Sequence, residues 1–163
     1  MVLTKDELIN SLKNEVRILL HLADKVQPAM VDYRPTAKQR STLELLRYMS
    51  MMGPQLVAAT QAGAFDPEAW TATAKATEAM DLAAVKKSIA AHADQYASLI
   101  GGMSEDDLRS PVTMFGQTSS KGAFITNTVL GGHAAYRTQL FLYLKSCGRE
   151  ELNTMNLWAG MDS

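Results

Sequence analysis

The chain has 163 residues, of which 47% are hydrophobic and 20% charged, and its net charge is −1. This composition is ordinary for one soluble domain with a sizeable core, so we expect a single domain over residues 1–163. The near-neutral charge argues against a nucleic-acid-binding or anionic-membrane-binding protein, and no apolar run approaches the roughly 18 residues that span a bilayer. A single cysteine excludes an internal disulfide, and the amphipathic N-terminus does not resemble a signal peptide. We therefore expect a cytoplasmic protein.

Four amphipathic segments predict helices, at about residues 4–26, 41–62, 81–101 and 119–147. Thr4 and Ser41 each precede a glutamate by three residues, which is the pattern of a capping box at a helix start. Within the second segment, Gly53 and Pro54 predict a kink, because proline removes a backbone donor and crowds the preceding turn.

A long connection separates the second and third predicted helices. Asp66 followed by Pro67 indicates the start of a short helix that carries Trp70. The connection is long enough to cross one end of a bundle, so the third helix need not be antiparallel to the second.

Two further segments lack a strong periodicity. Residues 104–119 are expected to form an irregular connection, and no segment of the chain predicts a strand. We expect the C-terminal tail to dock onto the bundle or onto a partner through Trp158, because a free apolar tail would be a liability. The predicted fold is therefore all-α, a four-helix bundle with a docked tail.

The last predicted helix carries polar side chains on its buried face. At 100° per residue one stripe contains seven residues: Val129, His133, Tyr136, Leu140, Tyr143, Leu144 and Cys147. Buried polar groups need partners, so this stripe predicts a site or the remains of one. His92 lies on the inner face or the flank of the third helix, and Arg137 follows Tyr136.

Familiar catalytic motifs are missing from the sequence. It has no Gly-rich phosphate loop, no G-x-S-x-G, no H-E-x-x-H, no C-x-x-C and no Glu-x-x-His pair. Cys147 is expected at a helix C-terminus, where a thiolate is not stabilised. His133 and Tyr136 have a spacing that suits two metal ligands, but a phenol titrates near 10. The residues alone therefore favour a hydrogen-bonded polar cluster over a metal site.

Two segments, DYRPTAKQRSTLELLRYMS and GGHAAYRTQLFLYLKSCG, resemble the DinB-like (YfiT-related) superfamily. The resemblance covers nearly the whole chain and implies a four-helix bundle, commonly a homodimer. It also implies an association with DNA-damage-inducible proteins and with metal-dependent hydrolases or thiol-dependent transferases.

The resemblance also implies where a metal site would lie. The family takes one histidine from the second helix and two from the fourth, and these positions hold Tyr48, His133 and Tyr136 here. With one histidine left, we expect no metal cofactor, and we expect Tyr48 and Tyr136 to hydrogen-bond His133 and to fill the vacated volume. The alternative is a divalent metal or ferric iron held by the same three residues.

Three functions follow from these observations. The first is a small-ligand-binding or interaction protein, a homodimer with its ligand in the bundle core, in a stress or DNA-damage response. The second is a metal-dependent hydrolase or thiol-dependent S-transferase that uses His133, and the third is a structural dimer without a pocket. The predicted binding residues are Tyr48, His92, His133, Tyr136 and Arg137. A pocket beside His133 would distinguish the three functions, because a closed, dry cluster there argues against the first two.

Overall fold

The computed structural model describes residues 3–163. Its helices are α1 (Lys5–Ala23), α2 (Thr42–Ala62), α3 (Pro67–Thr77), α4 (Leu82–Ala90), α5 (His92–Gly101), α6 (Glu105–Arg109), α7 (Lys121–Phe124) and α8 (Gly131–Ser146). Three short segments complete the helical part: the 3₁₀ turn η1 (Pro28–Met30) and the π-helical segments η2 (Ile125–Leu130) and η3 (Met155–Ala159). Two strands, β1 (Pro111–Met114) and β2 (Gln117–Ser120), form one antiparallel hairpin.

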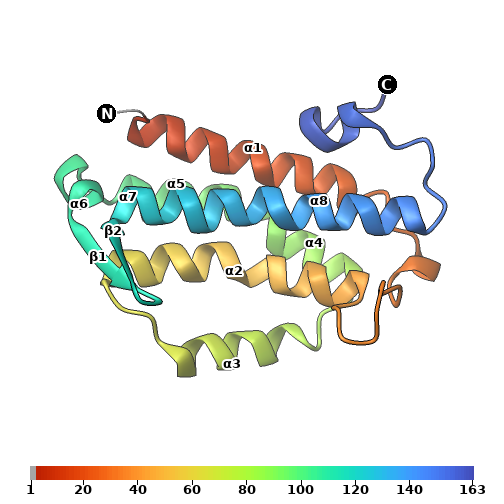
Figure 1. The fold of residues 1–163 in the computed structure, drawn as a ribbon, viewed down its shortest axis with the longest axis horizontal. Helices are drawn as coiled ribbons and strands as arrows, with labels where there is room; N and C mark the ends of the chain where they lie inside the picture. The colour runs from red at the N-terminus through yellow and green to blue at the C-terminus, as the bar shows by residue number, and fades with distance from the viewer. Residues whose placement is uncertain (1–2) are drawn as a thin grey trace.

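Four long helical rods form the bundle (Figure 1). The first two are α1 and α2; the third is α4 followed by α5, which are separated only at Ala91. The fourth is the continuous run of α7, η2 and α8. The prediction of an all-α helical bundle is confirmed. Its third rod is interrupted, and the first rod ends at Ala23, earlier than predicted.

The predicted helix caps are present. Thr4 and Ser41 accept hydrogen bonds from the backbone N–H of Glu7 and Glu44, and both glutamates reach back to the cap, so each start is a complete capping box. Asp66 caps α3, with Pro67 in its first turn.

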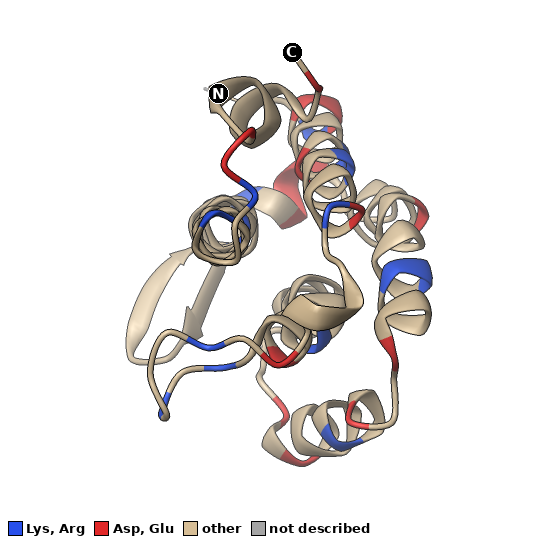
Figure 2. Cartoon of the chain, turned by 90° about the vertical axis from the view of Figure 1, so that its right-hand side faces the viewer, with Lys and Arg blue, Asp and Glu red and all other residues tan. Residues whose placement is uncertain are grey.

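The third rod runs parallel to α2. Arg47 Nε of α2 donates to the carbonyl of Met80 just before α4, and three residues later the carbonyl of Ser50 is 2.8 Å from His92 Nε2 at the start of α5. The two rods can be parallel because α3 carries the chain back along α2. Figures 1 and 2 both show α3 outside the four rods. The long connection predicted from the sequence thus carries the chain along the whole length of the bundle.

The core lies between the four rods. Its fully buried side chains come from every rod: Leu12, Leu19, Leu22, Leu45, Leu46, Met49, Met52, Ile89, Tyr96, Ile100, Ile125, Val129 and Leu140. Charged residues of both signs are scattered around the rods, without a face of one sign in the end view of Figure 2. Within residues 3–163, no helix is both long and apolar enough to cross a membrane.

The prediction that no segment forms a strand was wrong. Residues 111–120 form the β-hairpin, with Phe115 and Gly116 in its turn at φ 52° and 77°. Two successive positive φ values are typical of a tight hairpin turn, and glycine adopts them without a Cβ penalty. Each strand has only four residues, so alternation gave no usable signal, although Val112 and Met114 do point to a small second core with Phe124.

The tail docks onto the bundle, and the predicted Trp158 contributes one contact, with the Arg137 guanidinium of α8 5.5 Å from its ring centroid. The Trp158 side chain is 68% exposed. Leu152 and Asn156 are the buried residues of the tail, and Arg17 of α1 donates to the carbonyl of Ala159 (2.8 Å). The ion pair of Lys25 with Asp162 (2.6 Å) and the contact of Asn156 with His21 (3.1 Å) also hold the segment, so Trp158 is not its main anchor.

Candidate functional site

His133 of α8 lies in a closed cluster between the rods. Its Nε2 is 2.6 Å from the hydroxyl oxygen of Tyr96 on α5, and both side chains have no exposed surface. The two rings meet edge to face, with centroids 5.8 Å apart. Tyr96 was absent from the predicted site residues, although its place on the inner stripe of the third rod is the signal that would have indicated it.

Gly53 of α2 makes room for this hydrogen bond. A Cβ at Gly53 would lie 1.8 Å from the Tyr96 hydroxyl and 2.9 Å from His133 Nε2, which no real contact permits. The kink predicted at Gly53 and Pro54 stays a prediction, since α2 runs from Thr42 to Ala62 with Pro54 inside it. The structure gives Gly53 a further role, that of allowing close approach, which is a usual reason for a glycine within a helix.

His92 is the second buried histidine of the cluster. Its Nε2 pairs with the carbonyl of Ser50, and its ring lies 6.2 Å from that of His133 between centroids. Nδ1 of His92 and Nδ1 of His133 are both buried without a hydrogen-bond partner among the residues that the structure describes. Such orphaned atoms are uncommon in protein interiors, and they show that the cluster is polar but not fully satisfied by the chain.

Burial keeps this cluster neutral. It lowers the pKa of His133 to about 3, with smaller contributions from the neighbouring His92 and the positive charge of Arg137. Burial also lowers the pKa of His92, which the Ser50 carbonyl partly opposes, and it raises the pKa of Tyr96. At pH 7 both imidazoles and the phenol are therefore uncharged.

Tyr48 and Tyr136 do not hydrogen-bond His133, which corrects that prediction. Nε2 of His133 is paired with Tyr96 and its Nδ1 has no partner in the described chain. The two tyrosines pack instead against each other, with ring centroids 5.1 Å apart. Met52 lies between α2 and α8, its Cε 3.0 Å from where a Cβ of Gly132 would be, so it occupies the space beside the histidine.

Tyr48 is the centre of an aromatic surface on the outer side of α2. Its ring lies beneath the guanidinium of Arg40, 4.0 Å from the centroid, and 6.2 Å from the ring of Trp70 on α3. Partial burial, and then the neighbouring Tyr136 phenol, raise the pKa of Tyr48 to about 12. The phenol is therefore protonated at neutral pH.

Two open hollows flank Tyr48. The first, between α2 and α3, has a volume of about 340 Å³ and is lined by Arg40, Glu44, Arg47, Tyr48, Met51, Trp70, Ala74, Thr77 and Glu78. The second, between α2 and α8, has about 420 Å³ and is lined by Tyr48, Met52, Leu56, Asn127, Thr128, Gly131, Gly132, Ala135 and Tyr136. These volumes are in the range of small-molecule pockets. Tyr48 is the residue that they share.

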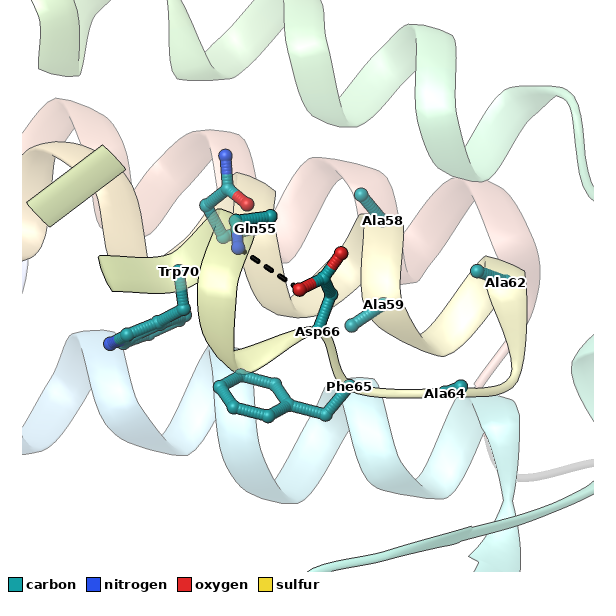
Figure 3. Close-up of a pocket in the computed structure, with 9 residues that line it drawn as sticks. Gln55, Ala58, Ala59, Ala62, Ala64, Phe65, Asp66 and Trp70 are labelled. Atoms are coloured by element: carbon teal, nitrogen blue, oxygen red, sulfur yellow. Dashed lines mark hydrogen bonds between the residues drawn. The ribbon is translucent and has the colours of Figure 1, made fainter. Parts of the chain in front are cut away.

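A third hollow lies on the other side of Trp70 and is shown in Figure 3. It is smaller, about 210 Å³, and alanines form most of its wall. Its one carboxylate, Asp66, already accepts the hydrogen bond drawn in the figure, from the N–H of Ala69 (3.0 Å). The hollow therefore has few polar groups to orient a ligand, and the two hollows beside Tyr48 are the better candidates.

Arg137 lies outside both regions, contrary to its prediction as a binding residue. Its side chain is 4% exposed and forms a two-pronged ion pair with Glu15 of α1, Nε to Oε2 at 2.6 Å and Nη2 to Oε1 at 3.1 Å. It also donates to the carbonyl of Leu157. Arg137 thus joins α1, α8 and the tail, and its donors are used by the protein itself.

Of the three positions that the resemblance implies for a metal site, two hold tyrosines, and Nε2 of His133 is hydrogen-bonded to Tyr96. Among residues 3–163, no three His, Cys, Asp or Glu side chains come together in a geometry that could hold a metal ion.

The comparisons with known proteins support the fold. No family model and no curated protein matches the sequence. Among solved structures, the chain is similar to a DinB-like protein (YjoA) from Bacillus subtilis, with a TM-score of 0.69 and 16% sequence identity over 90% of this chain and 94% of that one. The fold is therefore DinB-like. At this identity the similarity gives the architecture and not the activity.

Proposed function

We propose that this chain is a DinB-like bundle that works without a catalytic metal and binds a small ligand on the outer surface of α2, around Tyr48. The observation that carries the proposal is the position of Tyr48. It stands where the resemblance places a first metal ligand, yet it lies between two open hollows and packs with aromatic rings and an arginine. Aromatic walls with a few polar groups are typical of ligand pockets.

The closed state of the His133 cluster argues against both catalysis and ligand binding at that position. A general base must come within hydrogen-bond reach of the proton that it removes, and His133 has no exposed surface. The bundle core was the predicted place for a ligand, but the open space lies at the surface. We therefore assign the His92–Tyr96–His133 cluster a structural role.

The proposal includes the two finer expectations that the family resemblance carries. A homodimer is supported by the exposed apolar side chains of Leu142, Met155, Trp158 and Met161, since exposed apolar side chains often mark interfaces. Light scattering on the purified protein tests the homodimer. A monomer at about 100 µM, roughly 100 times a micromolar Kd, would contradict it. A stress or DNA-damage role is tested by the protein level in cells before and after DNA damage.

Metal analysis tests the first half of the proposal. We expect freshly purified protein, prepared without chelators, to contain far less than one equivalent of zinc, nickel, iron or manganese. Stoichiometric metal that is lost in a His133→Ala variant would instead support the hydrolase or transferase alternative.

A fragment screen tests the second half. We expect small aromatic compounds to raise the Tm of the protein and to lose this effect in Tyr48→Leu. The matched control is Tyr33→Leu, because Tyr33 is also half-buried and packs edge to face against an aromatic ring, that of Tyr143 at 5.5 Å, away from the hollows. Fragments that stabilise Tyr48→Leu as strongly as the wild type would show that they bind elsewhere.

A further inference from the structure

The hollow between α2 and α3 contains two arginines whose donors are largely unused. In the described part of the chain, the Arg40 guanidinium lies over the Tyr48 ring and makes no hydrogen bond or ion pair. Arg47 uses Nε for the carbonyl of Met80 at 2.8 Å, which fixes the side chain and leaves both terminal nitrogens without a hydrogen bond or an ion pair. A guanidinium presents paired donors in a plane, the geometry that a carboxylate accepts.

The carboxylates in the same hollow do not cancel this positive charge. Glu44 Oε2 accepts from the backbone N–H of Ser41 (2.7 Å) and pairs with Arg34 Nη2 (3.2 Å), and its interaction with the charge of Arg47 is weaker than that with Arg34. These contacts also lower the pKa of Glu44 and keep it ionised. Glu78 is exposed at the rim. With Glu44 balanced by Arg34, the remaining lining charges are Arg40, Arg47 and Glu78, a net charge of +1.

The apolar part of the hollow is aromatic. Tyr48 and Trp70 approach each other edge to face, and Met51 completes the wall between them. Their rings offer a large contact area with little loss of conformational freedom. The hollow thus combines rigid rings with two guanidinium groups.

We propose that this hollow takes a small aromatic carboxylate, with its carboxylate at Arg40 and Arg47 and its ring against Tyr48 and Trp70. This inference rests on the proposed function and adds to it the chemical class of the ligand. The volume of about 340 Å³ suits one or two rings. A neutral ligand would leave the guanidinium donors unpaired, and a cation would meet their positive charge.

Calorimetric titration with phenylacetate and with phenylacetamide tests the charge requirement, since the two compounds share their ring and their length. The titration is repeated in a Trp158→Phe variant, which removes the only other tryptophan of the sequence. A change in the fluorescence of Trp70 then shows that the compound binds beside it. We expect phenylacetate to bind about tenfold tighter than the amide and to change Trp70 emission, because hydrogen bonds to charged groups are each worth about one such factor.

Two variants place the carboxylate. Arg40→Gln and Arg47→Gln should each weaken phenylacetate binding about tenfold and leave the affinity for phenylacetamide unchanged. Lys38→Gln removes an exposed positive charge outside the hollow and should change neither affinity. The Arg40 side chain makes no hydrogen bond within the described chain, and its backbone carbonyl, which accepts from the Tyr143 hydroxyl, is kept in the variant, so Arg40→Gln is expected to fold even if Arg47→Gln does not.

Three results would overturn the inference. Equal affinity for phenylacetate and phenylacetamide would show that the ligand needs no negative charge, and the proposed binding surface around Tyr48 would be unaffected. Phenylacetate binding that is unaffected by Arg40→Gln places the carboxylate elsewhere. If neither probe binds at millimolar concentration while other fragments still need Tyr48, the ligand class is wrong and the proposed function stands.

Discussion

Two neighbouring regions of the molecule contrast sharply: the closed cluster of His92, Tyr96 and His133, and the open surface around Tyr48 and Tyr136. The side chains of the cluster are uncharged at neutral pH and have almost no exposed surface. The second lines two hollows and holds an arginine above a ring. The resemblance places His133 and the two tyrosines at one site, but the structure divides them between the inside and the outside of the bundle.

The division is made by small and flexible residues between α2 and α8. Gly53 lets Tyr96 reach His133, and Met52 packs against Gly132. The tyrosines are turned outward beside this wall, where Trp70 of α3 meets Tyr48. The two tyrosines are therefore approached from the outside of the bundle, and His133 is enclosed inside it.

The largest expected effect compares truncation in the two regions. His133→Ala should lower the free energy of unfolding by about 3–5 kcal/mol, because it leaves a cavity and an unpaired Tyr96 hydroxyl in the core. Tyr136→Ala should cost clearly less, since its side chain is only partly buried. Urea unfolding measures both, and equal losses would show that the outer surface is as much a part of the core as the inner cluster.

A smaller effect is expected from adding one methyl group. Gly53→Ala should destabilise the protein by about 2–3 kcal/mol, as overpacking does, because the new Cβ overlaps the Tyr96–His133 hydrogen bond. Gly131→Ala is the matched control in α8, where a Cβ would make an ordinary contact of 3.7 Å with the Thr126 carbonyl. Gly131→Ala should leave the free energy of unfolding unchanged or raise it slightly, because alanine has a higher helix propensity than glycine. A neutral Gly53→Ala would contradict the close approach.

The dependence of stability on pH should separate the two regions next. The pKa of His133 is near 6.5 when the chain is unfolded and about 3 when it is folded. Between these values the unfolded state binds more protons, so stability falls as pH decreases. From pH 6.5 to 5.5 this one histidine should cost about 1 kcal/mol. His133→Gln removes that part of the slope, and an unchanged slope in this variant would mean that His133 is not buried as a neutral ring.

The smallest effect is expected at the outer surface. Tyr48→Phe should change the free energy of unfolding by no more than about 0.5 kcal/mol, because its hydroxyl lies at the edge of an open hollow. The ring contacts with Arg40 and Trp70 remain. A loss above about 2 kcal/mol, the size of a buried hydrogen bond left unpaired, would place the hydroxyl in the protein interior.

The helices could be predicted because their signals are local. Thr4, Ser41, Asp66 and Asp81 cap the helices that the sequence assigned to them, and the apolar spacing marks the buried faces. The hairpin could not be predicted because two four-residue strands carry too little alternation. The exposure of Trp158 could not be predicted because backbone carbonyls and polar side chains, such as Asp162 at Lys25, hold the tail, and no apolar pattern reports them.

The candidate site was predictable only in part. The inward position of His133 follows from helical periodicity, and so does that of His92. Their partners depend on how the rods are rotated against one another, which decides that Tyr96 and not Tyr48 faces the imidazole. Gly53 was the one local signal of this arrangement. A glycine beside a proline also indicates a helix kink, and the sequence was interpreted in that way.

The parallel course of α2 and of the rod α4–α5 has a consequence for how the chain folds. In a bundle of alternating direction, neighbouring rods close through short loops, and such local contacts fold fast. Here the Ser50–His92 contact spans 42 residues, and the Glu15–Arg137 ion pair spans 122. We expect refolding to be slower than for an up-and-down bundle of equal length, with α3 and its two connections tolerant of insertions, because lengthening a closed loop costs little.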